Sequence, residues 1–460
     1  MCAISNKMLL LRLQNQNYSM SREIKELFRL GLPIMIGQLG IIILSFADTM
    51  MVGRYGTEEL AAASFVNNMF NLVIIFSTGF SYGLTPLVGG FFGRGDSRGV
   101  GRMLRNSLFV NGGVSLVLMA VMTVLFLNIH RLGQPEDLLP LMRPYFLVLL
   151  VSLFFVLLFN AFKQFCDGIT DTLTPMCILL CGNLFNIFGN WVLIYGKFGF
   201  PELGLLGAGV STLVSRILML LGFIVIFFTA KRYKPYRYGF ADSVVNLPDV
   251  RSLVRMGMPV GLQMGMETAS FSLSTVMVGW LGATALAAHQ VMLTVGQIGF
   301  MMYYGMAAAV AVRASNFKGS SDTVAVRRTV AAGFRIIMAM VAVVAVVMLS
   351  LKNYIGFMFT DSSEVALMVS GLVIPFVIYQ FGDGLQCNYS NALRGISDVK
   401  MVTWYAFIAY FVVSLPSGYF FGFIMDMGLP GIWLSFPLGL TCAGILFQRR
   451  FSRTMSLFAR

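Results

Sequence analysis

Two stretches of this sequence match without a gap: MVGRYGTEELAA, residues 51–62, and MVGWLGATALAA, residues 277–288. Three more pairs follow in the same order: GLP at 31–33 with GMP at 257–259, DGITD at 167–171 with RGISD at 394–398, and GLLGAGVS at 204–211 with GLPGIWLS at 428–435. Four matches in one order indicate an internal repeat. We therefore predict two related halves, residues 1–240 and 241–460, joined by the polar and basic segment 230–251.

The composition indicates that both halves lie in a membrane. Hydrophobic residues make up 57% of the chain and charged residues 12%, and the mean hydropathy is +0.79. Soluble domains carry about 25% charged residues. Continuous apolar runs of about 20 residues recur along the whole length, which is typical of membrane-spanning helices and not of the alternating strands of a barrel. The predicted class is an all-α integral membrane protein.

Twelve spans are predicted. They lie near 29–52, 60–90, 104–127, 143–163, 174–195, 203–228, 252–280, 284–312, 327–351, 366–392, 399–424 and 430–448. If both termini are cytoplasmic, the inner segments and helix edges hold 26 of the 33 Lys and Arg residues. The outer loops then hold only 5. The positive-inside rule thus predicts a multi-pass protein of the cytoplasmic (inner) membrane with both termini inside.

The net charge of +13 agrees with this topology. Basic residues at the inner face attract anionic lipid, so we expect membrane lipids as partners and no nucleic acid.

The even number of spans per half sets the symmetry. Six helices in each half bring both halves into the membrane the same way round, so an axis along the membrane normal relates them. We predict two homologous six-helix bundles around a central cleft, moving by alternating access. A monomer is expected, because one chain supplies both halves.

Three acids fall inside predicted spans: Asp48, Glu267 and Asp383. A charge at the bilayer centre costs about 2.5–3.5 kcal/mol on insertion scales, so each acid indicates a role. A purely structural reading is a neutral, hydrogen-bonded carboxylic acid in a packed bundle. The acids lie in segments rich in Gly, Ser, Thr or Gln, and no basic residue in the same spans offers an obvious partner. An acid of this kind can bind a mobile cation, either a proton or a metal ion.

Other polar and aromatic residues extend this pattern. Asn186 and Asn190 are four residues apart and share one helix face, either as interhelical hydrogen-bonding groups or as a polar lining beside Asp48. Gln290 offers a further amide. Phe300, Tyr303 and Tyr379 could hold organic cations against their ring faces. Arg216, inside a span, either extends to the interface or pairs with an acid.

At these residues the sequence resembles the multidrug and toxic compound extrusion (MATE) family, most closely its NorM-like branch. The resemblance rests on four stretches: FADTMMVG at 46–53, NIFGNWVLIYGKFGFPELGLLGAG at 186–209, LAAHQV at 286–291, and YQFGDGLQ with NALRG at 379–395. It covers nearly the whole chain. It implies a cation-coupled antiporter that exports lipophilic, often cationic drugs and dyes, and hence a contribution to antibiotic resistance.

The resemblance also implies roles for particular residues. Asp48, Glu267 and Asp383 match the family's coupling acids, and Asn186 and Asn190 match asparagines that line the cavity of its N-terminal half. Some relatives carry a tyrosine where Phe300 stands here, so a hydroxyl ligand is absent at that point. No organic cofactor is expected.

The expected coupling ion is Na⁺. Glu267, Asp383 and Tyr379 offer the oxygen ligands that hard cations favour, and the resemblance makes the two acids neighbours. A proton carried by Asp48 is the alternative. Pro33 and Pro259 occupy equivalent positions, where they either permit a shape change or simply begin a helix.

Two other classes of function fit the sequence less well. A flippase for lipid-linked oligosaccharides would need a basic cavity to bind its anionic cargo, and the predicted interior is mainly acidic. An intramembrane protease is disfavoured because the first Gly of the GxGD pattern falls at Gln380, and because HExxH is absent. The protein is therefore not expected to be an enzyme.

Overall fold

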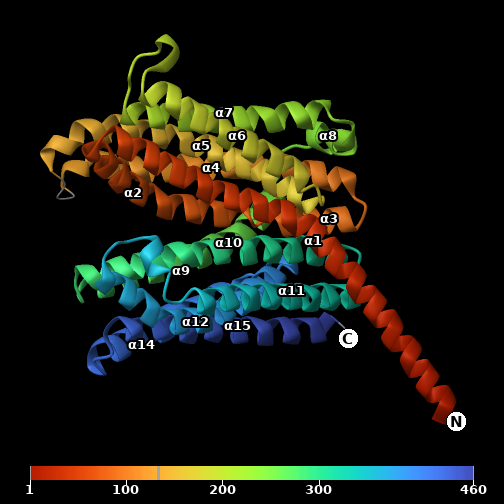
Figure 1. Cartoon of the computed structure of the whole chain (residues 1–460). Coiled ribbons are helices and arrows are strands. Elements are labelled where there is room, and N and C mark those ends of the chain that lie inside the picture. Colours follow the sequence, from red (N-terminus) through yellow and green to blue (C-terminus); the bar gives the residue numbers. More distant parts are fainter. Residues whose placement is uncertain (1, 132–134, 459–460) are drawn as a thin grey trace. The chain divides into compact units, whose positions relative to one another are not determined.

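The structure is a computed structural model that describes residues 2–131 and 135–458, almost entirely as helices (Figure 1). The long helices are α1 (Cys2–Tyr55), α2 (Thr57–Ser81), α4 (Ser97–Leu127), α5 (Leu139–Gly168), α6 (Leu173–Ile194), α7 (Leu205–Thr229), α9 (Leu247–Gly279), α10 (Ala283–Gly319), α11 (Thr323–Ser350), α12 (Ser363–Gly395) and α15 (Gly428–Phe458). Shorter helices are α3 (Leu84–Gly93), α8 (Lys234–Asp242), α13 (Lys400–Phe407) and α14 (Leu415–Tyr419).

Eleven of the predicted spans are long and apolar enough to cross a membrane within the described ranges. The missing span is α9, which contains the predicted span 252–280 and has 33 residues. Its central part is too polar to qualify, because Gln263, Glu267 and several serines and threonines interrupt the apolar residues. The chain is thus an all-helical, multi-pass integral membrane protein, and the count of twelve spans stays a prediction.

Two predicted spans are less regular than a single α-helix. The span predicted at 60–90 is interrupted between α2 and α3 at Tyr82 and Gly83. Pro86 has no N–H to donate to the carbonyl of Tyr82, which favours the break. The span predicted at 399–424 contains two π-helical stretches, 408–414 and 420–424, on either side of α14. Pro416 lies in α14, and such bulges commonly adjust a helix around a proline.

The matched sequence pairs adopt matching backbone conformations. Gly204 precedes α7 with φ 54°, and Gly428 begins α15 with φ 57°. The turns after DGIT and RGIS place Thr170 at φ 65° and Ser397 at φ 62°. Left-handed conformations are uncommon for residues with a Cβ. Their recurrence at equivalent positions therefore shows that both repeats use the same local geometry.

The chain separates into two compact units. The N-unit comprises Ile36–Ala269 and Val399–Thr403, and the C-unit comprises the residues up to Met35, Ser270–Asp398 and Trp404 onward. The opening parts of α1 and α9 therefore each belong to the unit built mainly from the other half. The predicted boundary at residue 240 describes the repeat in the sequence and stays a prediction.

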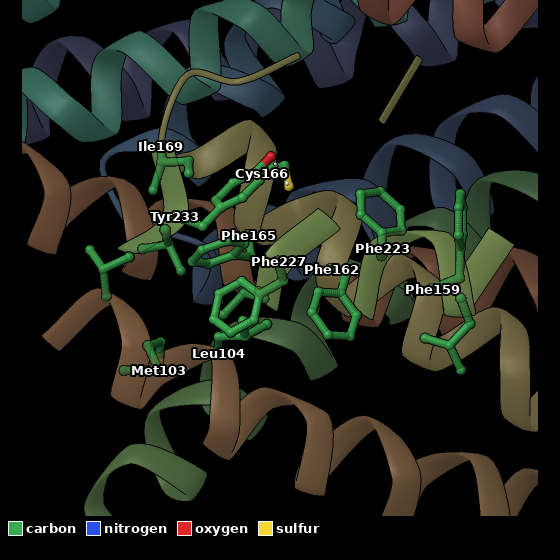
Figure 2. Close-up of a cluster of buried hydrophobic side chains, with 14 of the residues drawn as sticks. Met103, Leu104, Phe159, Phe162, Phe165, Cys166, Ile169, Phe223, Phe227 and Tyr233 are labelled. Carbon is green, nitrogen blue, oxygen red and sulfur yellow. Dashed lines mark hydrogen bonds between the residues drawn. The ribbon is translucent and has the colours of Figure 1, made fainter. Parts of the chain in front are cut away.

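The core of the N-unit contains a large cluster of buried hydrophobic side chains, several of them aromatic (Figure 2). It joins α4, α5 and α7, and Phe162 stacks on Phe223 with ring centroids 5.8 Å apart. The cluster consists of Phe80, Leu84, Val88, Val100, Met103, Leu104, Val110, Phe159, Phe162, Phe165, Cys166, Ile169, Leu179, Leu220, Phe223, Phe227, Tyr233 and Leu253. In the C-unit, α12 packs against α10, α11 and α15.

Glycines allow the opening part of α9 to pack closely against α2 and α3 in the N-unit. A Cβ at Gly83 would lie 2.6 Å from the backbone nitrogen of Gly257, and a Cβ at Gly79 would lie 2.9 Å from the Cα of Gly261. Such distances are too short for any side chain. The glycine of the GMP stretch is therefore required for a close approach of two backbones.

The opening part of α1 makes the equivalent contact with α10 in the C-unit. A Cβ at Gly31 would lie 2.9 Å from Sδ of Met306, and a Cβ at Gly305 would lie 2.7 Å from Cγ of Met35. Gly31 and Gly257 are 226 positions apart, as are Gly79 and Gly305. The two repeats thus exchange the first part of their opening helices through one repeated contact.

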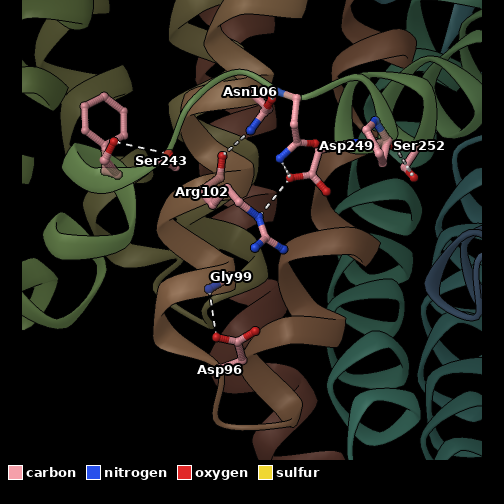
Figure 3. A network of polar contacts seen from close by, with 10 residues as sticks. Asp96, Gly99, Arg102, Asn106, Ser243, Asp249 and Ser252 are labelled. Carbon is pink, nitrogen blue, oxygen red and sulfur yellow. Dashed lines mark hydrogen bonds and ion pairs between the residues drawn. The ribbon is translucent and has the colours of Figure 1, made fainter.

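An ion pair accompanies each exchanged segment. In the C-unit, Arg313 donates to both carboxylate oxygens of Glu23, at 2.6 and 2.7 Å, and Thr329 Oγ1 donates to the same carboxylate at 2.6 Å. In the N-unit, Arg102 Nε donates to Asp249 Oδ2 at 2.9 Å (Figure 3). Glu23 and Asp249 are also 226 positions apart.

Pro33 and Pro259 lie inside α1 and α9, two residues after the glycines of the close contacts. The interpretation of these residues as simple helix-start prolines is therefore wrong. The helices begin much earlier, because Met20–Leu32 and Leu247–Met258 pack onto the other repeat's helices instead of forming a loop.

Candidate functional site

A polar network crosses the interior of the N-unit and contains Asp48. Asn190 Nδ2 donates to Asp48 Oδ1 at 2.5 Å and to Asn186 Oδ1 at 3.2 Å. Asn186 in turn donates to Thr212 Oγ1 of α7 at 3.2 Å. Both asparagines are buried, with 2% and 0% of their surface exposed. The spacing of four residues places the two amides on one face of α6, so one helix turn connects the acid of α1 to α7.

Two further polar groups lie in the N-unit. Tyr145 OH of α5 donates to Asn67 Oδ1 of α2 at 3.1 Å. Arg216 Nη1 of α7 donates to Ser152 Oγ of α5 at 2.5 Å. Arg216 is in electrostatic range of both Asp48 and Tyr145. The sequence left the role of Arg216 open, and in the structure it donates to Ser152 and interacts electrostatically with the acid of α1.

The C-unit holds Asp383 and Tyr379 on one face of α12, almost fully buried at 1% and 8% exposure. Aromatic rings surround Tyr379 with centroids between 5.7 and 6.4 Å from its own: Phe271, Phe376, Trp433 and Phe436. Apolar walls lower the local dielectric and strengthen any electrostatic interaction of the acid. Tyr379, which was predicted to line the cavity, therefore lies in an aromatic cage one helix turn before Asp383.

Two residues near Asp383 complete this polar centre, which we call the Asp383 centre: Asp383, Tyr379, Gln380 and Tyr303. A Cβ at Gly299 would lie 3.2 Å from Gln380 Oε1 and 3.4 Å from Tyr303 OH, so both groups meet over this glycine. Both side chains are fully buried, and neither the Gln380 amide nor the Tyr303 hydroxyl bonds to another described residue. Buried polar groups are nearly always satisfied. These groups therefore have hydrogen-bonding capacity that the other described side chains do not use.

Gln380 was missed as a site residue, and Tyr303 was predicted only as a ring for organic cations. In the sequence, Gln380 stood out only as the residue that interrupts a protease pattern. A glutamine within an apolar run was the signal that could have identified it as a site residue. Its neighbour Gly299 lies 81 positions away, and only the packing of α10 on α12 brings them together.

The remaining predicted site residues are more scattered. Glu267 lies in the N-unit, half-buried on α9, whereas Asp383 and Tyr379 lie in the C-unit. The predicted grouping of these three around Na⁺ stays a prediction. Phe300 packs on Tyr304 at 5.6 Å between ring centroids, and Tyr304 accepts a hydrogen bond from Arg394 at 3.0 Å. The Gln290 side chain is exposed.

The acids, amides and hydroxyls described above are groups that can bind a cation or a polar ligand. Among the described residues, no set of three His, Cys, Asp or Glu side chains is placed to hold a metal ion. A cation at the Asp383 centre would depend on one carboxylate with hydroxyl and amide oxygens, which suits a weakly held hard cation or a proton. Together the fold and these sites define a polytopic α-helical membrane protein with ionisable groups inside its spans.

Comparisons with known proteins agree with that class. The family model MatE matches twice, at residues 33–192 and 259–420, once in each predicted half. A protein of Photorhabdus laumondii called "Probable multidrug resistance protein NorM" is 29% identical over 437 residues, 93% of this chain and 95% of that protein. This chain belongs to the MatE family, whose members are transporters and not enzymes.

Solved structures share the fold. An outward-facing multidrug resistance MATE family transporter superposes with a TM-score of 0.87 at 19% identity, over 95% of this chain and 97% of that one. A MATE transporter of Vibrio cholerae gives a TM-score of 0.86 at 16% identity, over 96% of this chain and 100% of that one.

Proposed function

We propose that this protein is a multidrug efflux antiporter that exports lipophilic, often cationic compounds by alternating access. The observation that carries the proposal is the presence of one acidic centre in each unit of a MatE-family chain: the half-buried Asp48 with its buried asparagines, and the Asp383 centre. An acid inside a span that takes up and releases a cation supplies the differential binding that coupling requires. The name of the Photorhabdus relative supports drugs as the substrate class.

The proposed coupling ion is Na⁺, bound by Glu267, Asp383 and Tyr379. The Asp383 centre favours a metal cation, because Gln380 and Tyr303 add two neutral oxygens next to the carboxylate. Oxygen-rich sites with one or two carboxylates suit hard cations. Drug and Na⁺ would then weaken each other's binding by the same factor, as linkage demands. Proton coupling through Asp48 is the alternative that the experiment must separate.

The proposed setting is the cytoplasmic (inner) membrane, with both termini inside and the protein working as a monomer. The distribution of Lys and Arg supports the orientation. The presence of both repeats in one chain supports the monomer.

The test is efflux from proteoliposomes of the purified full-length protein. A fluorescent cationic dye is the substrate, and Na⁺ and proton gradients are imposed separately at a fixed membrane potential. We expect transport with a Na⁺ gradient at constant pH, and none when K⁺ or choline replaces Na⁺. Full transport without Na⁺, lost when the pH gradient collapses, would assign proton coupling. Scrambling of a lipid-linked sugar without dye transport would support the flippase instead.

A further inference from the structure

His289 is fully buried in α10 of the C-unit, with 0% of its surface exposed. Its Nε2 lies 3.0 Å from Thr275 Oγ1 of α9. The hydroxyl of Thr275 donates its single hydrogen to the carbonyl oxygen of Phe271, one helix turn earlier, at 3.0 Å. The hydroxyl oxygen therefore accepts from His289, which places the ring proton on Nε2. One hydrogen bond between α10 and α9 thus orients the imidazole.

The imidazole contacts two rings of the aromatic cage around Tyr379. Its centroid lies 5.5 Å from that of Trp433, at an interplanar angle of 70°, and 6.4 Å from that of Phe436, at 24°. The centroids of the same two rings lie 6.3 Å from that of Tyr379. Trp433 and Phe436 are therefore shared between His289 and the tyrosine of the Asp383 centre.

Packing alone does not require a histidine at this position. Nδ1 of His289 has no hydrogen-bond partner in the part of the chain that the structure describes. A buried polar ring that uses one of its two nitrogens loses hydration without full compensation, whereas a leucine would bury no polar atom. The hydrogen bond to Thr275 therefore indicates that the orientation of the ring matters.

The two repeats differ at this hydrogen bond. Thr49 is the equivalent of Thr275, 226 positions earlier, and its hydroxyl donates in the same way to the carbonyl oxygen of Ser45 at 2.9 Å. At the same offset, His289 corresponds to Ala63. The bond that the threonine donates is thus common to both repeats, whereas the histidine that donates to the threonine belongs to the C-unit.

The rings that His289 contacts show the same difference between the repeats. By the match of residues 204–211 with 428–435, Trp433 corresponds to Gly209, and the next position, Phe436, corresponds to Thr212. Both positions are small in the first repeat and aromatic in the second. The histidine and its two aromatic neighbours therefore occur together, in the unit that contains the Asp383 centre.

We propose that His289 is a positioning residue for the Asp383 centre. Its hydrogen bond to Thr275 fixes the two rings that it shares with Tyr379, and thereby sets the affinity of the centre for its cation. The inference rests on the proposed cation coupling and adds to it a residue that touches neither cation nor substrate. A tyrosine whose ring is already held in place has little freedom left to lose when its oxygen binds a cation, so preorganisation raises the affinity.

Trp433 provides a reporter for this proposal. The chain has four tryptophans, and the other three, Trp191, Trp280 and Trp404, are 41%, 64% and 60% exposed. Replacing these three with Phe leaves Trp433, which is 1% exposed, as the only tryptophan of the purified full-length protein. In detergent, Na⁺ is titrated against choline at constant pH and ionic strength, and the change in emission gives the affinity. Time-resolved anisotropy of the same fluorescence gives the mobility of the indole ring.

Two pairs of variants separate the hydrogen bond from the bulk of the side chains. His289→Leu and Thr275→Val remove the bond at similar volume, whereas His289→Gln and Thr275→Ser keep a donor and an acceptor. We expect the first pair to weaken Na⁺ binding about fivefold or more, the scale of one lost hydrogen bond, and to add a fast component to the anisotropy decay. The second pair should stay within about twofold of the parent protein.

The matched control is Thr49→Val. It removes the equivalent threonine bond in the N-unit, where Ala63 stands in place of the histidine, and should change neither readout. Thermal unfolding separates positioning from a general loss of structure. His289→Leu should melt no lower than the parent protein, because it removes a buried polar group with an unused nitrogen.

Unchanged Na⁺ affinity in His289→Leu and Thr275→Val would overturn the proposal. Equal losses in all four variants would also overturn it, because the hydrogen bond would then not be the cause. The Thr275 pair decides the question if His289→Leu does not fold. If the parent protein responds to neither Na⁺ nor protons, the proposed coupling at the Asp383 centre fails. The anisotropy then decides the positioning separately, and an unchanged decay in Thr275→Val would overturn it.

Discussion

At the scale of single residues, the acids inside the predicted spans and their neighbours carry the proposed mechanism. Asp48 and Asp383 lie in polar centres of different composition: amides and an arginine around the first, hydroxyl and glutamine groups with aromatic walls around the second. The first suits an organic substrate with hydrogen-bonding groups. The second suits a small cation held by oxygens.

Neutralising the proposed coupling acids should abolish efflux without removing the protein from the membrane. Glu267→Gln and Asp383→Asn preserve volume and hydrogen bonding but cannot exchange a cation. We expect dye efflux from cells to fall to the background of an empty vector, at unchanged membrane abundance. Wild-type efflux in both variants would reduce these acids to structural groups.

Gln380 gives a sharper distinction between structure and function. Its buried amide has no hydrogen-bond partner among the described residues, and leaving such a group unsatisfied costs about 1–3 kcal/mol. Gln380→Leu should therefore raise the thermal stability of the purified protein while lowering Na⁺-driven efflux. Raised stability with unchanged efflux would remove Gln380 from the Asp383 centre. The control is Gln297→Leu on α10, where the side chain is exposed.

At the scale of helices, the exchanged opening segments are the main feature. Each repeat places the start of its first helix against the second helix of the other repeat through a glycine contact. An ion pair accompanies each contact, with Arg313 of α10 in the C-unit and with Arg102 of α4 in the N-unit. Pro33 and Pro259 lie two residues after these glycines, inside α1 and α9. A proline at that point removes a backbone hydrogen bond and lowers the resistance of the helix to bending.

The ion pair of α1 should contribute to stability. Removing one partner of a buried pair typically costs about 3–5 kcal/mol, because the other charge remains buried. Glu23→Gln should therefore lower the unfolding temperature clearly, whereas Glu26→Gln, whose carboxylate is 3.9 Å from Arg313 and more exposed, should have little effect. The exchange Glu23→Arg with Arg313→Glu should recover part of the loss. Equal melting of all four proteins would show that the pair is dispensable.

The glycine contact should tolerate no added carbon. In Gly257→Ala the new Cβ would lie 2.6 Å from the carbonyl oxygen of Phe80, a backbone atom that cannot move independently. Overpacking of this kind costs about 1–3 kcal/mol. Gly279→Ala on the same helix meets nothing within 4 Å and is the matched control. Thermal unfolding of both variants in detergent tests this prediction. A Gly257→Ala protein as stable as the Gly279→Ala control would contradict the close contact.

At the scale of the whole molecule, the exchange makes the halves depend on each other. The sequence divides at residue 240, but the compact units take the residues up to Met35 from one half and the start of α9 from the other. Separation of the halves would expose the faces that these segments cover in both units.

Expression of the two halves as separate chains tests this dependence. Residues 1–240 or 241–460 alone should be degraded or aggregate, whereas co-expression should yield a complex that purifies on a tag carried by one half. The readouts are membrane abundance and dye efflux. A single half that purifies as a stable, monodisperse protein would contradict the expected dependence of one half on the other.

The helical class, most of the spans with their approximate ends, and the repeat could be predicted from the sequence. Apolar run length is a local property, and the glycines at 204 and 428 mark the same turn in both halves because only local sterics act there. The polar residues of α9 were also visible in the sequence. They make this helix more polar than the other predicted spans, and the same feature made Glu267 a candidate site residue. The family resemblance likewise rested on contiguous residues.

Which segments pack together could not be predicted from the sequence and is seen only in the folded chain. The exchange of opening helices depends on α9 packing against α2 and on α1 packing against α10, contacts between residues more than 150 positions apart. The same holds for Gln380 and Tyr303 over Gly299. A hydrogen bond or an ion pair weakens steeply over a few tenths of a nanometre. The spacing of residues along the chain does not specify such distances between helices. They are set by the way the helices pack.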